Sequence, residues 1–134
     1  LIKKELGWKN DELEGVPDEL NEHGEKIECF MQGTRDYVKY LKRGYSRVSQ
    51  INSLNVRNNR MTPEEAKESN EKFDGRKPHS LEIFLEYVGL SEEEFNQIVD
   101  KTVIHPNKPN YKSNEIAKKT RDFDDWYREN NKKK

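Results

Sequence analysis

Residues 34–60 read TRDYVKYLKRGYSRVSQINSLNVRNNR, and they carry the clearest helical pattern of the chain. Its apolar residues recur every three or four positions, which predicts two amphipathic helices separated by Gly44. The first helix is expected over about 27–43 and the second over about 47–58. Helical spacing turns two apolar sets inward, Tyr37, Val38 and Leu41 in the first helix and Val48, Ile51 and Leu54 in the second.

Positive charge is concentrated in the same stretch. It holds seven Lys or Arg and one acid, Asp36, in a chain whose net charge is −1. The segments 1–33, 34–60, 61–100 and 101–134 sum to −5, +6, −7 and +5. Such a surface either meets an anion or is ordinary solvated helix, and the charge pattern leaves both interpretations open.

The composition predicts helices around a small core. Hydrophobic residues make up 31% of the chain and charged residues 38%, with a mean hydropathy of −1.26. Because the apolar residues keep helical spacing, these values indicate thin amphipathic helices rather than disorder. We therefore expect one all-α domain of about five to six helices, which leans on a larger partner.

Several helix boundaries are predicted by local signals. The expected N-caps are Thr62 (with Pro63 and Glu65), Ser80 and Ser91 (with Glu94). Gly89 is expected to end the helix that begins at Ser80, and Leu90 and Phe95 to pack across the cap at Ser91. A last helix over about 113–130 carries an apolar stripe made of Ile116, Thr120, Phe123 and Trp126/Tyr127.

Several kinds of site are not expected. The single cysteine, Cys29, excludes an internal disulfide and a zinc site with two thiolates, and no metal site is predicted. No catalytic residue is predicted either, because the seven glycines are scattered and no Ser or Cys nucleophile has a neighbouring His. Without a signal-like or membrane-length apolar run, we expect a cytoplasmic protein with no membrane contact.

Anion binding is therefore the chemistry that the residues themselves favour. Guanidinium groups grip phosphate or carboxylate through paired hydrogen bonds, and a helix that begins after Gly44 adds backbone N–H groups. The candidate substrate- or phosphate-binding residues are Lys42, Gly44, Arg47, Ser53, Arg57 and Arg60. The flanking acidic segments favour a compact nucleotide or sugar acid over RNA or DNA.

The same residues resemble a known family. TRDYVKYLKRGYSR at 34–47 and NVRNNRMTPEEA at 55–66 are similar to the C-terminal part of the N-acetyl sugar amidotransferases. LGWK at 6–9 and FLEYVGLSEEEF at 84–95 support the match, which covers roughly 5–106. These enzymes act in the biosynthesis of lipopolysaccharide, pseudaminic acid and legionaminic acid. Pro63 departs from the family pattern, in which an arginine is common.

The resemblance implies a fragment of a larger α/β enzyme of the ATP pyrophosphatase class. In such enzymes ATP activates a sugar acetamido group, and ammonia from a glutaminase partner converts it to an acetamidino group. Residues 1–26 would connect to an upstream ATP-binding domain, whose Ser-Gly-Gly-Lys-Asp-Ser loop this chain lacks, and 27–134 would form the C-terminal helical domain. The fragment alone is expected to be inactive.

Carried over by motif position, Arg47 and Arg57 would contact the anionic part of a nucleotide sugar or sugar acid, and Lys42 an ATP-derived phosphate. A structural alternative is that these cations pair with acids on neighbouring helices. A functional alternative is a non-enzymatic helical module, which binds a protein or nucleic-acid partner through its basic face.

Overall fold

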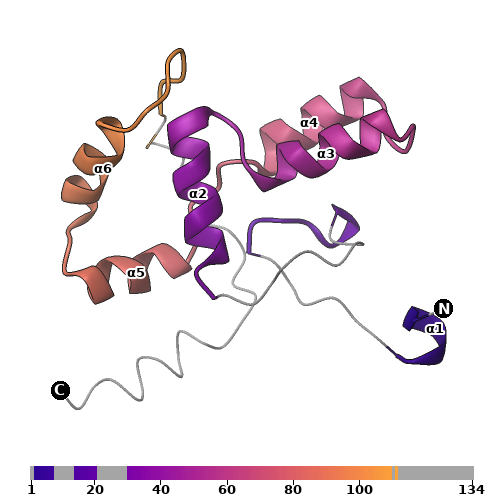
Figure 1. Ribbon diagram of the computed structural model, residues 1–134, viewed down its shortest axis with the longest axis horizontal. Coiled ribbons are helices and arrows are strands. Elements are labelled where there is room, and N and C mark those ends of the chain that lie inside the picture. Colours follow the sequence, from indigo (N-terminus) through magenta and orange to yellow (C-terminus); the bar gives the residue numbers. More distant parts are fainter. Residues whose placement is uncertain (1, 8–13, 21–29, 110, 112–134) are drawn as a thin grey trace.

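The computed structural model describes residues 2–7, 14–20, 30–109 and 111 (Figure 1). Regular structure in these ranges consists of α1 (Ile2–Glu5), η1 (Asp18–Leu20), α2 (Gln32–Arg43), α3 (Arg47–Arg57), α4 (Pro63–Phe73), α5 (Ser80–Val88) and α6 (Glu92–Asp100). No strand occurs in them, so the predicted all-α class is confirmed. None of these helices has the length and apolar character needed to cross a bilayer.

Some sequence predictions fall on residues that the structure does not describe. The last helix, expected over about 113–130, lies outside the described residues. The same holds for 27–29, where the first helix was expected to begin, and for much of the connector predicted over 1–26. Phe30 and Met31 form a turn, so the described part of the first helix begins at Gln32.

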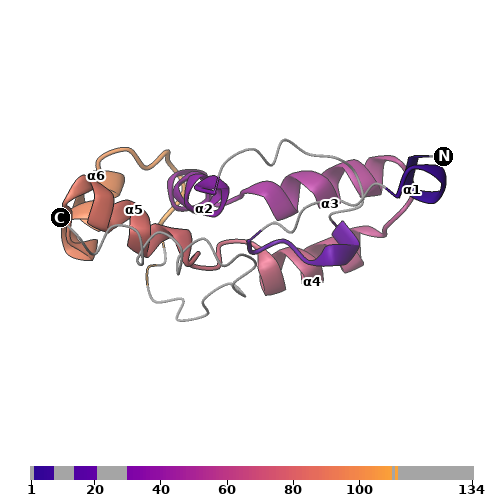
Figure 2. The ribbon, with the colours of Figure 1, turned by 90° about the horizontal axis from the view of Figure 1, so that it is seen from below.

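Helices α2 to α6 form two groups that meet at the junction of α2 and α3 (Figures 1 and 2). In the first group, α2, α5 and α6 surround a buried apolar cluster, made of Tyr37, Leu41, Leu81, Leu85, Phe95 and Val99. Val38 packs against this cluster, so the predicted inward face of the first helix is confirmed. In the second group, α3 and α4 form a hairpin, and η1 contacts α3.

The predicted inward face of α3 is only partly correct. Val48 is buried and Ile51 is half-buried, but the side chain of Leu54 is 48% exposed. The fully buried polar residue is instead Asn52, whose Nδ2 donates to Asn70 Oδ1 at 2.7 Å. Leu54 stays exposed because α3 packs on α4 and η1, and so buries a narrower stripe than an apolar periodicity alone implies.

Two helices are capped by residues next to them in sequence, as predicted. The Thr62 hydroxyl accepts from the Glu65 N–H at 3.2 Å, and the Glu65 carboxylate accepts from the Thr62 N–H at 2.8 Å. Ser91 and Glu94 make the same pair of bonds at the start of α6, with the same lengths. These reciprocal bonds satisfy backbone donors that the first turn of each helix leaves unpaired.

The first turns of α2 and α5 are instead hydrogen-bonded to side chains from distant parts of the chain. Ser80 was predicted to cap α5, but it is the first residue of that helix, and its hydroxyl accepts from the Thr34 N–H of α2 at 3.1 Å. The start of α5 is capped instead by the carboxylate of Glu14, which accepts from the His79 N–H and, at 2.7 Å, from the Ser80 hydroxyl. Gly33 permits this approach, because a Cβ there would collide with the Glu14 carboxylate.

Candidate functional site

A depression of about 510 Å³ lies along one face of α3. Its walls come from Tyr45, Ser49, Gln50, Ser53, Leu54 and Arg57. The Arg57 Nε donates to the Ser53 carbonyl at 3.3 Å, which holds the guanidinium beside Ser53. The volume falls within the range of about 300–1,000 Å³ that is typical of small-molecule sites. Two predicted site residues, Ser53 and Arg57, are thus brought together.

Sequence reasoning missed Tyr45, Gln50 and Leu54 as parts of this depression. A usable signal was present for the α3 part of the depression, because Ser49, Ser53 and Arg57 recur every four residues and therefore share one side of that helix. Tyr45 precedes the helix, so helical spacing does not place it there. Tyr45 is 41% exposed, and the Lys39 ammonium lies 5.5 Å from the centroid of its ring. The depression therefore combines an exposed aromatic ring, hydroxyl and amide groups, and cations near both ends.

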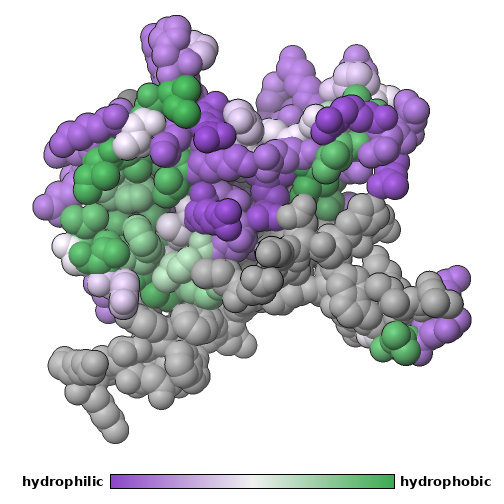
Figure 3. Space-filling view, in the orientation of Figure 1, coloured by the Kyte–Doolittle hydropathy of each residue, from purple (hydrophilic) through white to green (hydrophobic). Residues whose placement is uncertain are grey.

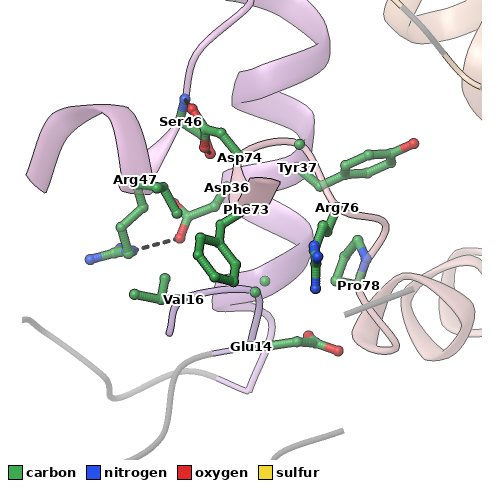
Figure 4. A pocket seen from close by; sticks show the side chains of 14 residues that line it. Glu14, Val16, Asp36, Tyr37, Ser46, Arg47, Phe73, Asp74, Arg76 and Pro78 are labelled. Carbon is green, nitrogen blue, oxygen red and sulfur yellow. Dashed lines mark hydrogen bonds and ion pairs between the residues drawn. The ribbon is translucent and has the colours of Figure 1, made fainter. Parts of the chain in front are cut away.

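Arg47 is positioned differently from the prediction (Figure 4). Its Nε lies 2.6 Å from Asp36 Oδ2 on α2, and the two side chains are 13% and 17% exposed. Asp36 also accepts from Gln32 Nε2 at 3.0 Å. Arg47 and Arg57 are the first and last residues of α3, so about 15 Å of helix separates them. The two arginines therefore do not converge on one small ligand.

The cavity beside Arg47 is too small for a nucleotide. It lies between α2, the start of α3 and the 14–16 loop, and its volume of about 20 Å³ is close to the space that one water molecule needs. The same region includes two further charged residues, Asp74 and Arg76. This cavity is a polar packing defect where α2, the start of α3, the 14–16 loop and residues 73–78 meet (Figure 4).

The sequence favours the first turn of α3 as a source of N–H groups for a bound anion. The structure instead places a carboxylate of the chain there. Asp74 accepts from the Ser46 N–H at 2.9 Å and from the hydroxyls of Ser46 and Ser49. Burial raises the pKa of the Tyr40 hydroxyl, and the negative charge of Asp74 raises it further. The start of α3 is therefore already matched to a negative charge within the chain.

Lys42 and Gly44 lie where α2 ends and a returning loop packs. The Lys42 carbonyl accepts from the Ile104 N–H at 2.9 Å, and Asn107 Nδ2 donates to the neighbouring Leu41 carbonyl at 2.6 Å. Gly44 has a φ of 80°, and a Cβ on it would lie 2.8 Å from Asn107 Oδ1. A glycine at this position is therefore explained by the helix end and the loop contact.

Arg60 lies in the turn between α3 and α4, on the exposed surface. Its N–H donates to the Asn55 carbonyl at 2.8 Å, within the turn that follows α3. Pro63 occupies the first position of α4, behind the Thr62 cap. Proline suits that position because the N–H it lacks would have no helical partner.

The arrangement as a whole is suited to binding. Among the described residues no group of three His, Cys, Asp or Glu side chains is placed to hold a metal ion. The α3 depression offers a guanidinium that can pair with phosphate or carboxylate, hydroxyl and amide groups for a polar ligand, and a tyrosine ring for a planar or sugar face.

Comparison with known proteins gives one family. A family model described as "LPS biosynthesis protein WbpG-like, C-terminal domain" matches residues 25–124, which is about three quarters of the chain. No curated protein and no solved structure matches. The matched span contains α2 to α6 and every residue that lines the α3 depression.

Proposed function

This chain belongs to the WbpG-like C-terminal domain family of LPS biosynthesis proteins, and from this premise we propose that it is the helical C-terminal part of an ATP-dependent N-acetyl sugar amidotransferase. The parent enzyme would convert a sugar acetamido group to an acetamidino group during the synthesis of a surface polysaccharide. The observation that carries the proposal is the α3 depression, in which Ser53 and Arg57 lie together with Tyr45.

The depression would hold the anionic part of a nucleotide sugar or sugar acid. Arg57 would pair with the phosphate or carboxylate, and Ser53 and Gln50 would bond to hydroxyl groups of the ligand. Tyr45 would lie against the flat face of a sugar or base. Arg47, held by Asp36, would position the start of α3 rather than touch the substrate.

Other parts of the reaction belong to other parts of the enzyme in this proposal. ATP would bind mainly to an upstream domain, because the chain has no glycine-rich phosphate loop and the cavity beside Arg47 holds about 20 Å³. A glutaminase-type subunit would supply ammonia. Lys42, at the end of α2, would face an ATP-derived phosphate once the domains are assembled.

Steady-state kinetics of the full-length enzyme tests the role of the depression. Arg57→Ala should raise the KM for the nucleotide sugar about tenfold to one-hundredfold, the loss expected for one charge-assisted hydrogen bond. The KM for ATP should change little. Arg35→Ala is the matched control, since Arg35 is an exposed arginine on α2 outside the depression. Equal constants for Arg57→Ala and the parent would refute the assignment.

The alternative is a non-enzymatic module, which gives a different result in a binding experiment. In that case the chain would bind mixed oligonucleotides with an affinity that falls steeply with salt, and neither ATP nor a nucleotide sugar would alter the binding. The acidic segments 1–33 and 61–100 argue against this outcome, because they flank the basic stretch on both sides.

A further inference from the structure

Tyr45 is the residue of the α3 depression that lies outside a helix, between the Gly44 cap of α2 and the Ser46 cap of α3. The backbone is fixed on both sides of it. The Gly44 N–H donates to the Tyr40 carbonyl at 2.7 Å. The Ser46 N–H donates to Asp74 Oδ2 at 2.9 Å. With the backbone held, the orientation of the Tyr45 ring depends on its side-chain rotamer and on what contacts the ring.

Lys39, a half-buried residue of α2, contacts this ring. Its ammonium lies 5.5 Å from the ring centroid, within the distance of about 6 Å at which a cation is attracted to an aromatic face. The surface over the junction of α2 and α3 is hydrophilic, whereas apolar side chains gather over α5 and α6 (Figure 3). A charged partner for an aromatic ring suits this surface.

The two ends of the depression are held by different means. At one end the Arg57 Nε donates to the Ser53 carbonyl, a bond within α3. At the other end the contact with Lys39 joins the Tyr45 ring to α2. Lys39 is not one of the residues that line the depression, so it acts there through the ring. A ring that is already held binds a ligand more tightly, because it loses less conformational freedom on binding.

We propose that Lys39 is a positioning residue of the α3 depression, which holds the Tyr45 ring in the orientation that receives the flat face of the ligand. This inference rests on the proposed function, in which Tyr45 lies against a sugar or base. Its consequence is specific: Lys39 strengthens ligand binding only while the ring is present.

Steady-state kinetics of the full-length enzyme tests this role. Lys39→Met removes the cation, and it should raise the KM for the nucleotide sugar about two- to fivefold, as expected for the loss of one exposed cation–π contact, with kcat unchanged. Lys39→Arg keeps a cation and should restore most of the affinity. Arg35→Met is the matched control, because it removes one exposed positive charge from the same helix and should keep the parent KM.

A double-mutant cycle separates positioning from simple charge attraction. Tyr45→Leu should raise the KM, and adding Lys39→Met to it should cause no further rise. The same fold-increase with and without the ring, or a parent KM in Lys39→Met, would overturn the inference. Arg57→Ala distinguishes this failure from failure of the proposed function, since a parent KM in that variant refutes the binding role of the depression itself.

Proton NMR of the full chain tests the contact without any substrate. The ring current of Tyr45 should shift the Lys39 Cε protons upfield, and Tyr45→Leu should abolish the shift. Tyr87→Leu is the control, because Tyr87 is a 76% exposed tyrosine on α5, and it should leave these protons unchanged. Lys39 Cε protons that resonate at the ordinary lysine position in the parent would overturn the positioning role.

Discussion

At the scale of single residues, carboxylates from distant positions fix where the helices begin. Asp74 lies at the end of α4, and it accepts three hydrogen bonds from Ser46 and Ser49 at the start of α3. Glu14 does the same for α5. A negative charge near the first turn is favoured both by unpaired N–H groups and by the helix dipole.

Replacing Asp74 should therefore destabilise the chain more than replacing an ordinary surface acid. Asp74→Ala should lower the free energy of unfolding by about 2 kcal/mol, since it leaves partly buried donors at the start of α3 without their acceptor. Urea unfolding followed by circular dichroism measures the change. Glu71→Ala on exposed α4 is the control and should stay within about 0.5 kcal/mol of the parent. Equal losses in both variants would refute the capping role.

At the scale of helices, the sequence predicts a boundary well when the signal is local. The capping boxes at Thr62 and Ser91 involve residues three positions apart, so α4 and α6 could be placed correctly. Ser80 and Asp74 could not be assigned in the same way, because their partners lie 46 and 28 positions away. Ser80 looked like a cap for its own helix and proved to cap α2.

In the candidate site, too, local features could be predicted from the sequence and contacts between distant residues could not. Ser53 and Arg57 belong to one face of α3, and their proximity follows from helical spacing alone. Whether Arg47 belongs with them depends on Asp36 of another helix, which the charge pattern could not place. Helical spacing predicts Leu54 in the core, because it lies in register with Val48 and Ile51. Leu54 is nevertheless exposed, because α4 covers a narrower stripe of α3 than this spacing implies.

The capping box of α6 makes the stability depend on pH in a defined direction. Hydrogen bonds from the Ser91 N–H and hydroxyl lower the pKa of Glu94. A lowered pKa in the folded state means that this contribution is complete above the ordinary glutamate pKa, and is lost as the pH falls through the lowered value. Glu94→Gln keeps a capping bond without a titrating group, so its stability should fall less steeply below that pH.

Urea titrations at several acidic pH values measure this difference. Glu93→Gln is the control. Glu93 lies in the same first turn of α6, whereas the capping box with Ser91 is made by Glu94. The control should follow the parent curve more closely than Glu94→Gln does. Parallel pH curves for the parent and Glu94→Gln would contradict the assignment.

At the scale of the whole molecule, the two helix groups differ in what holds them. The core cluster of α2, α5 and α6 consists of apolar side chains. In α3 and α4, in contrast, the buried residues are Val48, the small Ala66 and the polar Asn52. The Asn52 Oδ1 has no hydrogen-bond partner among the described residues. The hairpin is joined to α2 by the ion pair of Arg47 with Asp36, and its own two helices are joined by the hydrogen bonds that Asp74 accepts from Ser46 and Ser49.

Amide hydrogen exchange in increasing urea should therefore resolve two levels of opening. The amides of α3 and α4 should exchange through a local opening at a lower free energy than those of α2, α5 and α6, because the hairpin buries less apolar surface. Asp74→Ala should lower the first level further and leave the second nearly unchanged. If the amides of all five helices merge into one isotherm in the parent and in Asp74→Ala, the domain opens as a single unit. The depression on α3 would then share the stability of the core. If the α3–α4 hairpin instead opens at its own lower free energy, a ligand held by Arg57 and Ser53 would stabilise this less stable group first.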